Sequence, residues 1–255
     1  MEEDHTFEQA VRRHDAQVVE LGLPLWVGSE PTFTDREAQT PAWLHAALGD
    51  DKELRARALT VTLSGLMPGA LVLRSVGRLY PGEKQPRWNL GLLRRRDGEP
   101  LWDGPPDPLL AAEPSPDGPP DIAAFASALV EAFASQQWAS ECVEAAKEEG
   151  EEDAEKEAAD DGPAWTVSVT ADPKTEPLQF VLRTFDDKAD PDAARAPYAA
   201  IDLPEIARVD TLLAILPCIA HAARACSLPE LVIAGASPPV DATLELTTVT
   251  PDPAV

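Results

Sequence analysis

The stretch Leu25-Trp-Val-Gly-Ser-Glu30-Pro-Thr-Phe-Thr-Asp-Arg-Glu37 places a carboxylate at the end of a short apolar segment. The run that ends at Val27 predicts a buried strand, and Gly28 and Pro31 stop it. Glu30 falls at this break, where its side chain can leave the core and face a cleft. A polar residue at a strand end is also ordinary surface, so the pattern leaves both interpretations open.

A second stretch of the same kind is Arg78-Leu-Tyr-Pro-Gly-Glu83-Lys-Gln-Pro-Arg87-Trp88. Pro81 and Gly82 occupy the two central positions expected of a type II turn. Two exits from strands, each carrying a carboxylate and the second also carrying arginines, resemble the parts of an anion and metal site. Spacing alone does not join the two stretches into one site.

Arg94-Arg95-Arg96 is a concentrated basic cluster in an otherwise acidic chain. We interpret it as a solvated strand end before the turn at Asp97-Gly98. The alternative is a patch that faces phosphate, because the guanidinium group offers fork-shaped donors to phosphate oxygens.

The formal net charge is −24 over 255 residues. Such a surface repels nucleic acids and anionic membranes, because binding to phosphates needs clustered Lys and Arg. The sequence also shows neither a signal peptide nor an apolar run of the roughly 20 residues that span a bilayer. We therefore expect a cytoplasmic protein that binds neither nucleic acid nor membrane.

The three cysteines, Cys142, Cys218 and Cys226, show no metal-binding spacing. Cys218 and Cys226 lie on an apolar helical pattern, where small thiols are ordinary core residues. We interpret them as structural.

Apolar periodicity predicts an α+β fold with a mixed or mostly antiparallel sheet and flanking helices, because no regular alternation of strand and helix is present. Helices are expected at 7–21, 41–49, 50–66, 121–146 and 204–225, with Pro217 kinking or breaking the last. Strands are expected at 23–27, 70–76, 88–94, 165–170, 178–185, 231–233 and 243–249.

Composition divides the chain into five segments. Residues 105–120 are rich in Pro, Asp and Gly and are typical of a connector. Residues 147–162 belong to a strongly acidic run and are expected to form a solvated linker. The expected division is 1–104, 105–120, 121–146, 147–162 and 163–255.

Several motifs, taken in order, resemble the amidoligase family associated with bacterial transglutaminase-like proteins. They are His14-Asp15, Gly28-Ser-Glu-Pro-Thr-Phe33, Tyr80-Pro-Gly-Glu83, Pro86-Arg-Trp88 and Asp97-Gly-Glu-Pro-Leu-Trp102. The resemblance covers about His14 to Asp103, with a weaker echo from about Leu203 to the end.

The resemblance implies a fold that is in part like glutamine synthetase. It also implies ATP-dependent joining of a carboxylate to an amine through an acyl phosphate. Mg²⁺ would be held by carboxylates, because this hard cation prefers oxygen ligands. Glu30 and Glu83 are then the expected metal ligands, Arg78 and Arg87 the expected ATP phosphate binders, and Glu30 with Arg87 the expected catalytic pair.

The chain departs from the family pattern in three ways. Ser29 stands where the family has a second glycine, and Arg78 stands where it has lysine. The family pattern also continues into a last strand, expected to complete the site, that this sequence does not include. These departures favour a truncated or degenerate amidoligase-like domain that acts as a non-catalytic binding or assembly partner of another protein. Two alternatives stay open. One is an ATP-dependent ligase completed by another chain. The other is an acidic scaffold in which Glu30 and Arg87 form an internal ion pair.

Overall fold

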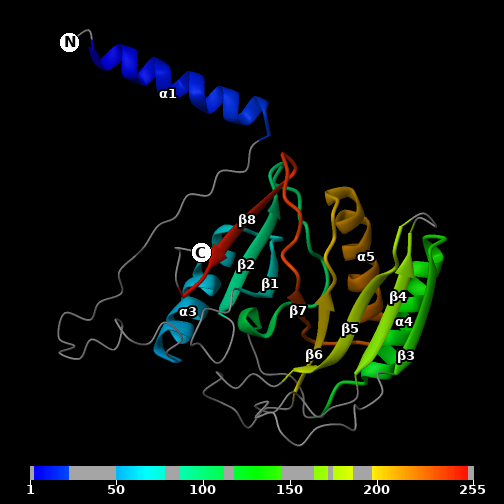
Figure 1. Ribbon diagram of the computed structural model, residues 1–255. Coiled ribbons are helices and arrows are strands. Elements are labelled where there is room, and N and C mark those ends of the chain that lie inside the picture. The colour runs from blue at the N-terminus through cyan, green and yellow to red at the C-terminus, as the bar shows by residue number, and fades with distance from the viewer. Residues whose placement is uncertain are drawn as a thin grey trace, which may run out of the picture.

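The computed structural model describes residues 3–22, 50–77, 87–111, 118–144, 164–171, 175–185 and 197–251. In this part of the chain, eight strands form one mixed sheet with helices packed on it, which confirms the α+β class (Figure 1). The strands are β1 (Leu71–Val76), β2 (Trp88–Arg95), β3 (Ala139–Glu144), β4 (Trp165–Thr170), β5 (Leu178–Phe185), β6 (Tyr198–Leu203), β7 (Val232–Gly235) and β8 (Leu244–Val249). The helices are α1 (Glu3–Glu20), α3 (Asp50–Leu66), α4 (Ile122–Ser135), α5 (Val209–Ala225) and the 3₁₀ turn η1 (Pro108–Leu110).

The strand order is β3-β4-β5-β6-β7-β1-β2-β8. Strands β3 to β6 pair antiparallel along the chain, and β1, β2 and β8 form a second antiparallel group. The two groups meet at β7, which pairs parallel with both β6 and β1. The link from β6 to β7 runs through α5, as a parallel pair requires a crossover.

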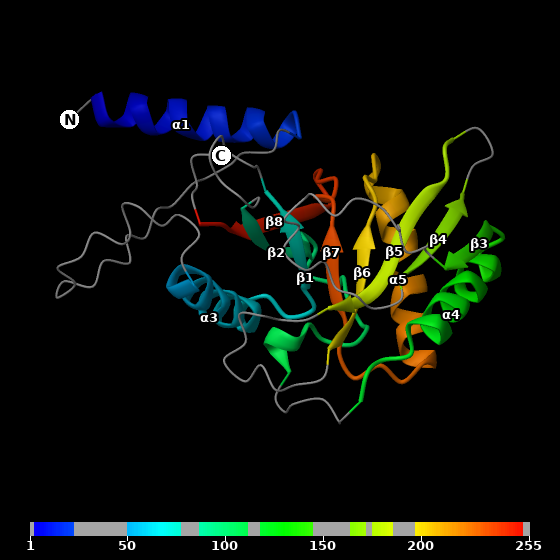
Figure 2. The ribbon, with the colours of Figure 1, turned by 60° about the horizontal axis from the view of Figure 1, so that its bottom comes forward.

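Helices α4 and α5 lie side by side against one face of the sheet and bury the main core (Figures 1 and 2). The core includes Phe125 and Phe133 of α4, Leu212 of α5, and Leu182 and Ile201 of the sheet, all fully buried. Alternate residues of each strand point to this face, as the period of two along a strand dictates.

The N-terminus of α4 is capped by the residue before it. Asp121 adopts an extended conformation and its carboxylate accepts a hydrogen bond from the Ala124 backbone N–H at 2.9 Å. This bond satisfies one of the donors that a helix start leaves unpaired.

The helix expected over 121–146 is wrong in its second half, because α4 ends at Ser135 and the chain returns as β3. Gln137 takes a φ of 63° at the reversal, and the Trp138 ring then stacks on Phe133 with centroids 5.7 Å apart. The alanines and glutamates after Trp138 favour a helix locally. Pairing with β4 along six residues overrides that preference.

Strand β6 was not predicted, although it lies in the middle of the sheet. Its sequence, Tyr-Ala-Ala-Ile-Asp-Leu, is weakly β-forming, but both of its neighbours supply hydrogen bonds. The helix was expected to kink or break at Pro217, and it does not break there, since α5 runs continuously through this residue. Pro217 faces solvent there.

Candidate functional site

Three of the four predicted site residues, Glu30, Arg78 and Glu83, lie outside the described residues. Arg87 is described and is buried, with 8% of its surface exposed, directly before β2. Its backbone oxygen accepts a hydrogen bond from the Gly77 N–H at 2.6 Å. A Cβ on Gly77 would lie 3.1 Å from that oxygen, so glycine suits the close approach. Gly77 and Arg87 are therefore held together at the two ends of the segment that contains Arg78 and Glu83.

The sheet face opposite α4 and α5 carries a row of charged side chains that joins both strand groups. Arg74 of β1 and Asp202 of β6 are both in register with Ala234 of β7, one on each side of it. Because paired positions share a face of the sheet, the two parallel pairings bring Arg74 and Asp202 onto one surface.

Arg74 is held by a buried carboxylate from a distant segment. Its Nε and Nη2 donate to the two carboxylate oxygens of Asp107 at 3.0 and 2.6 Å. The side chains are 9% and 2% exposed. Asp107 also accepts a hydrogen bond from the Leu109 N–H at 2.8 Å and so caps η1. The carboxylate thus fixes both the guanidinium and the turn after it.

Arg183 of β5 is held in the same manner by Asp202 of β6, with distances of 2.8 and 3.1 Å. The Phe185 ring lies near both guanidinium groups, 5.1 Å from Arg74 and 5.6 Å from Arg183. An aromatic ring attracts a cation over its face. Phe185 therefore links the two ion pairs across β5, β6, β7 and β1.

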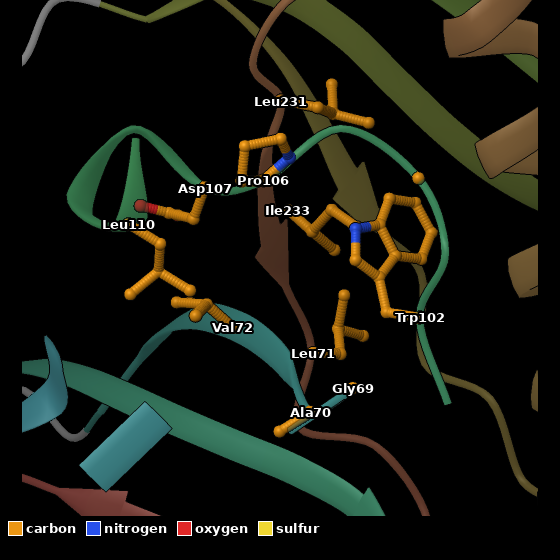
Figure 3. Close-up of a pocket in the computed structure, with 11 residues that line it drawn as sticks. Gly69, Ala70, Leu71, Val72, Trp102, Pro106, Asp107, Leu110, Leu231 and Ile233 are labelled. Carbon is orange, nitrogen blue, oxygen red and sulfur yellow. The ribbon is translucent and has the colours of Figure 1, made fainter. Parts of the chain in front are cut away.

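A cavity of about 190 Å³ lies where Trp102 and the turn η1 approach the start of β1 (Figure 3). β1 and β7 are in register only at Arg74 and Ser75, and before that point the Leu231 N–H bonds instead to Pro106 O at 3.0 Å. The segment around Pro106 therefore fills the space between the two strands. Most of the residues that line the cavity are apolar by type, although backbone polar groups also face it, and its acidic residue, Asp107, is already paired with Arg74.

The motif that ends in Leu101 and Trp102 has a structural role at this place. The backbone N–H groups of both residues donate to Gly69 O, at 2.9 and 3.1 Å. The Trp102 indole donates to Pro105 O at 2.8 Å, and Gly104 lies against the ring where a Cβ would not fit. The motif thus anchors the connector to the start of β1.

The three consecutive arginines are each bound to a carboxylate of the chain. Arg94 and Arg96 contact Glu245 of β8, at 3.1 and 3.4 Å, and Arg95 pairs with Asp97. The ordinary interpretation, a strand end facing solvent, therefore agrees with the structure better than a patch directed at phosphate.

The described ranges contain no group of three His, Cys, Asp or Glu side chains arranged to hold a metal ion. The predicted ligands Glu30 and Glu83 are not part of those ranges, so the metal prediction stays a prediction. Burial raises the pKa of the Cys218 thiol, and burial together with the nearby Asp121 raises that of Cys226. Both shifts disfavour the reactive thiolate, as expected for structural cysteines.

Sequence reasoning missed the paired residues of the charged face: Arg74, Asp107, Arg183, Phe185 and Asp202. The sequence did contain a signal for the two arginines of this face, because Arg74 and Arg183 are single charged residues inside apolar strands. Such a charge must point away from the core or find a partner. Which aspartate each arginine meets depends on strand order, which periodicity does not supply.

Comparison with known proteins identifies the class. Residues 2–176 match the family described as Putative amidoligase enzyme (DUF2126), which is more than half of the chain. The chain therefore belongs to this family. The match continues beyond Asp103, where the resemblance was expected to fade, and passes through the acidic run. No curated protein and no solved structure matches the chain. No helix within the described ranges has the length and apolar character needed to cross a membrane.

Proposed function

We propose that this member of the amidoligase family acts as a binding or assembly domain and does not join carboxylate to amine on its own. The observation that supports this is that arginines on the sheet are already paired with carboxylates of the same chain. Arg74 and Arg183 are bound in two-pronged pairs to Asp107 and Asp202, and Arg94 is bound to Glu245.

A phosphoryl-transfer site needs cations aimed at the group that is transferred, fixed before the reaction starts. A guanidinium that already donates two hydrogen bonds to a carboxylate is satisfied by the chain itself. The carboxylate must be displaced before phosphate can take its place. The charged face is therefore better suited to holding the strands in register than to stabilising a developing phosphate charge.

The second candidate is an ATP-dependent ligase completed by another polypeptide. It is favoured by one observation, that the family match includes Glu30, Arg78, Glu83 and Arg87. Of these, the described ranges include only Arg87, a buried cation directly before β2. Mg-ATP would supply the phosphoryl group that activates the carboxylate, and Glu30 and Glu83 would hold the metal.

The test is thermal unfolding with and without Mg-ATP, together with a measurement of phosphate release, on wild type and Glu30→Ala. Glu99→Ala is the matched control, since Glu99 is an exposed carboxylate just after the turn at Asp97-Gly98. The proposal expects no phosphate release from the purified chain. Steady release by wild type that Glu30→Ala abolishes and Glu99→Ala keeps would overturn it.

A shift in melting temperature without turnover would support a binding role and keep the second candidate open. Ligand at 100 times its Kd stabilises a protein by about 2.7 kcal/mol, which thermal unfolding detects readily. If Glu30→Ala lowers stability and no ligand effect exists in wild type, the acidic scaffold is the better description.

A further inference from the structure

Helix α1 and the residue directly after it carry a mostly apolar stripe with a regular spacing. Phe7, Val11, His14, Val18 and Leu21 follow one another at intervals of four, three, four and three residues. This is the heptad pattern, with valine at both a positions and Phe7, His14 and Leu21 at d positions. We call these five residues the α1 seam.

Three of the four apolar side chains of the α1 seam are exposed, and the fourth, Val18, is partly buried. Phe7 is 72% exposed, Val11 41% and Leu21 68%. Figure 1 shows α1 outside the packed layers of sheet and helices. Helices of this length gain most of their stability from packing an apolar face. An exposed apolar seam on such a helix therefore indicates that another surface covers it.

The shape of the stripe indicates what covers it. A helix that packs on a globular core has a wide apolar face, whereas a stripe limited to a and d positions is the narrower seam that inserts between the side chains of another helix. The occupant is therefore a helix or a groove between helices, with apolar side chains along its centre.

The charges beside the seam indicate the charge expected on the surface of that partner. Glu8 and Asp15 flank one side, and Gln17 flanks the other. Residues 1–22 hold six carboxylates against two arginines, and the whole chain carries −24. A second copy brings the same charge and is repelled, whereas Lys and Arg on a partner are attracted.

We propose that α1 is a docking helix, and that its seam binds an apolar helical surface of another protein whose rim is lined by Lys or Arg. The inference rests on the assembly role proposed above and adds where the partner binds and which chemistry recognises it. The acidic flank sets the orientation, because Glu8 and Asp15 meet the basic rim on one side only.

The experiment measures binding of the full chain to two dye-labelled synthetic helices by fluorescence anisotropy. Both peptides have three heptads with Val at a and Leu at d. One has Lys at every e and g position, and the other has Glu at those positions. We expect the Lys peptide to bind at least tenfold more tightly than the Glu peptide, and to weaken several-fold when salt is raised to about 0.5 M.

Variants locate the binding surface. Phe7→Asp and Leu21→Asp, made separately, are expected to weaken binding of the Lys peptide at least tenfold. Val19→Asp is the matched control, because Val19 is 79% exposed on the same helix but lies off the seam. It adds the same charge and should change affinity by less than twofold. The added negative charge would by itself strengthen binding to Lys, so a loss reports the lost apolar contact.

Three results would overturn the proposal. The first is equal affinity for the Lys and Glu peptides, or no binding to either. The second is a wild-type dimer in sedimentation that Phe7→Asp dissociates, which would assign the seam to a second copy. The third is a melting temperature that Phe7→Asp lowers and Val19→Asp does not, which would mean that the seam packs within its own chain. All measurements are made without nucleotide, so their outcome is separate from the phosphate-release test.

Discussion

Arg74 and Asp107, 33 residues apart in the chain, form a two-pronged ion pair that is almost completely shielded from water. The pair attaches the connector after β2 to the sheet strand β1, and it places Asp107 where it also caps η1. Removing water from two charges is costly, and only good geometry with further hydrogen bonds offsets that cost. The effect of the pair on stability is therefore largest when one of its two side chains is removed and the other stays buried.

Asp107→Ala should lower the free energy of unfolding by about 3–5 kcal/mol, because it leaves the Arg74 charge buried without this carboxylate and removes the cap of η1. Urea denaturation measures the change. Asp97→Ala is the control, because Asp97 forms a pair of the same kind with Arg95 at the surface, and it should have a much smaller effect. Equal effects of the two variants would contradict this account.

Gly69→Ala should destabilise the protein by about 1–3 kcal/mol from its backbone conformation alone, since Gly69 has a φ of +74°. A methyl group there would also meet Pro100 Cα at 2.7 Å, which adds to the cost. Gly98→Ala is the matched comparison, with a φ of +82° and open space around the new methyl group. Thermal unfolding should rank Gly69→Ala as the more destabilising variant, and the reverse order would refute the contact with the motif at Pro100.

Pro217→Ala should raise the stability of the protein, by up to about 3 kcal/mol, the difference between the two residues in a helix interior. Pro217 lies inside a continuous α5, faces solvent and donates no backbone hydrogen bond. The substitution therefore restores a helix hydrogen bond without creating a cavity. Melting temperatures of both proteins check it, and a lower value for the variant would show that the proline has a packing role.

Asp97 and Asp210 should titrate far below an ordinary aspartate. Hydrogen bonds from Arg95 and Arg208 lower the pKa of each carboxyl from 3.8 to about 2. A lowered pKa in the folded state contributes stability at pH values above the ordinary pKa. That contribution is lost as the pH falls from about 4 to about 2. It is small here, because both groups face water.

Carbon NMR of the carboxyl groups measures both midpoints directly. Arg95→Gln should return the pKa of Asp97 towards 3.8 and leave that of Asp210 unchanged, while Arg208→Gln should do the opposite. A wild-type midpoint near 4 at either aspartate would show that the corresponding pair does not persist in solution.

Local patterns were sufficient for much of the secondary structure. The helix predicted at 50–66 is α3, and the strands predicted at 165–170 and 178–185 are β4 and β5, which pair antiparallel. Gly22 follows α1 with a φ of +60°, a conformation that favours glycine at the end of a helix. These features depend on side chains close in sequence, such as an apolar stripe, a cap or a break.

The amino-acid sequence by itself determined the α+β class, the net negative charge and the family motifs, because composition, short-range periodicity and short motifs carry that information. Only the tertiary structure decided that 139–144 and 198–203 are strands, since their neighbours in the sheet supply hydrogen bonds that outweigh weak local preference. It alone also brought Arg74 to Asp107 and Arg183 to Asp202. The physical reason is that a charge inside an apolar strand must be paired or point to water, which the sequence shows. The order of the strands in the sheet then decides which carboxylate lies close enough to pair with each arginine.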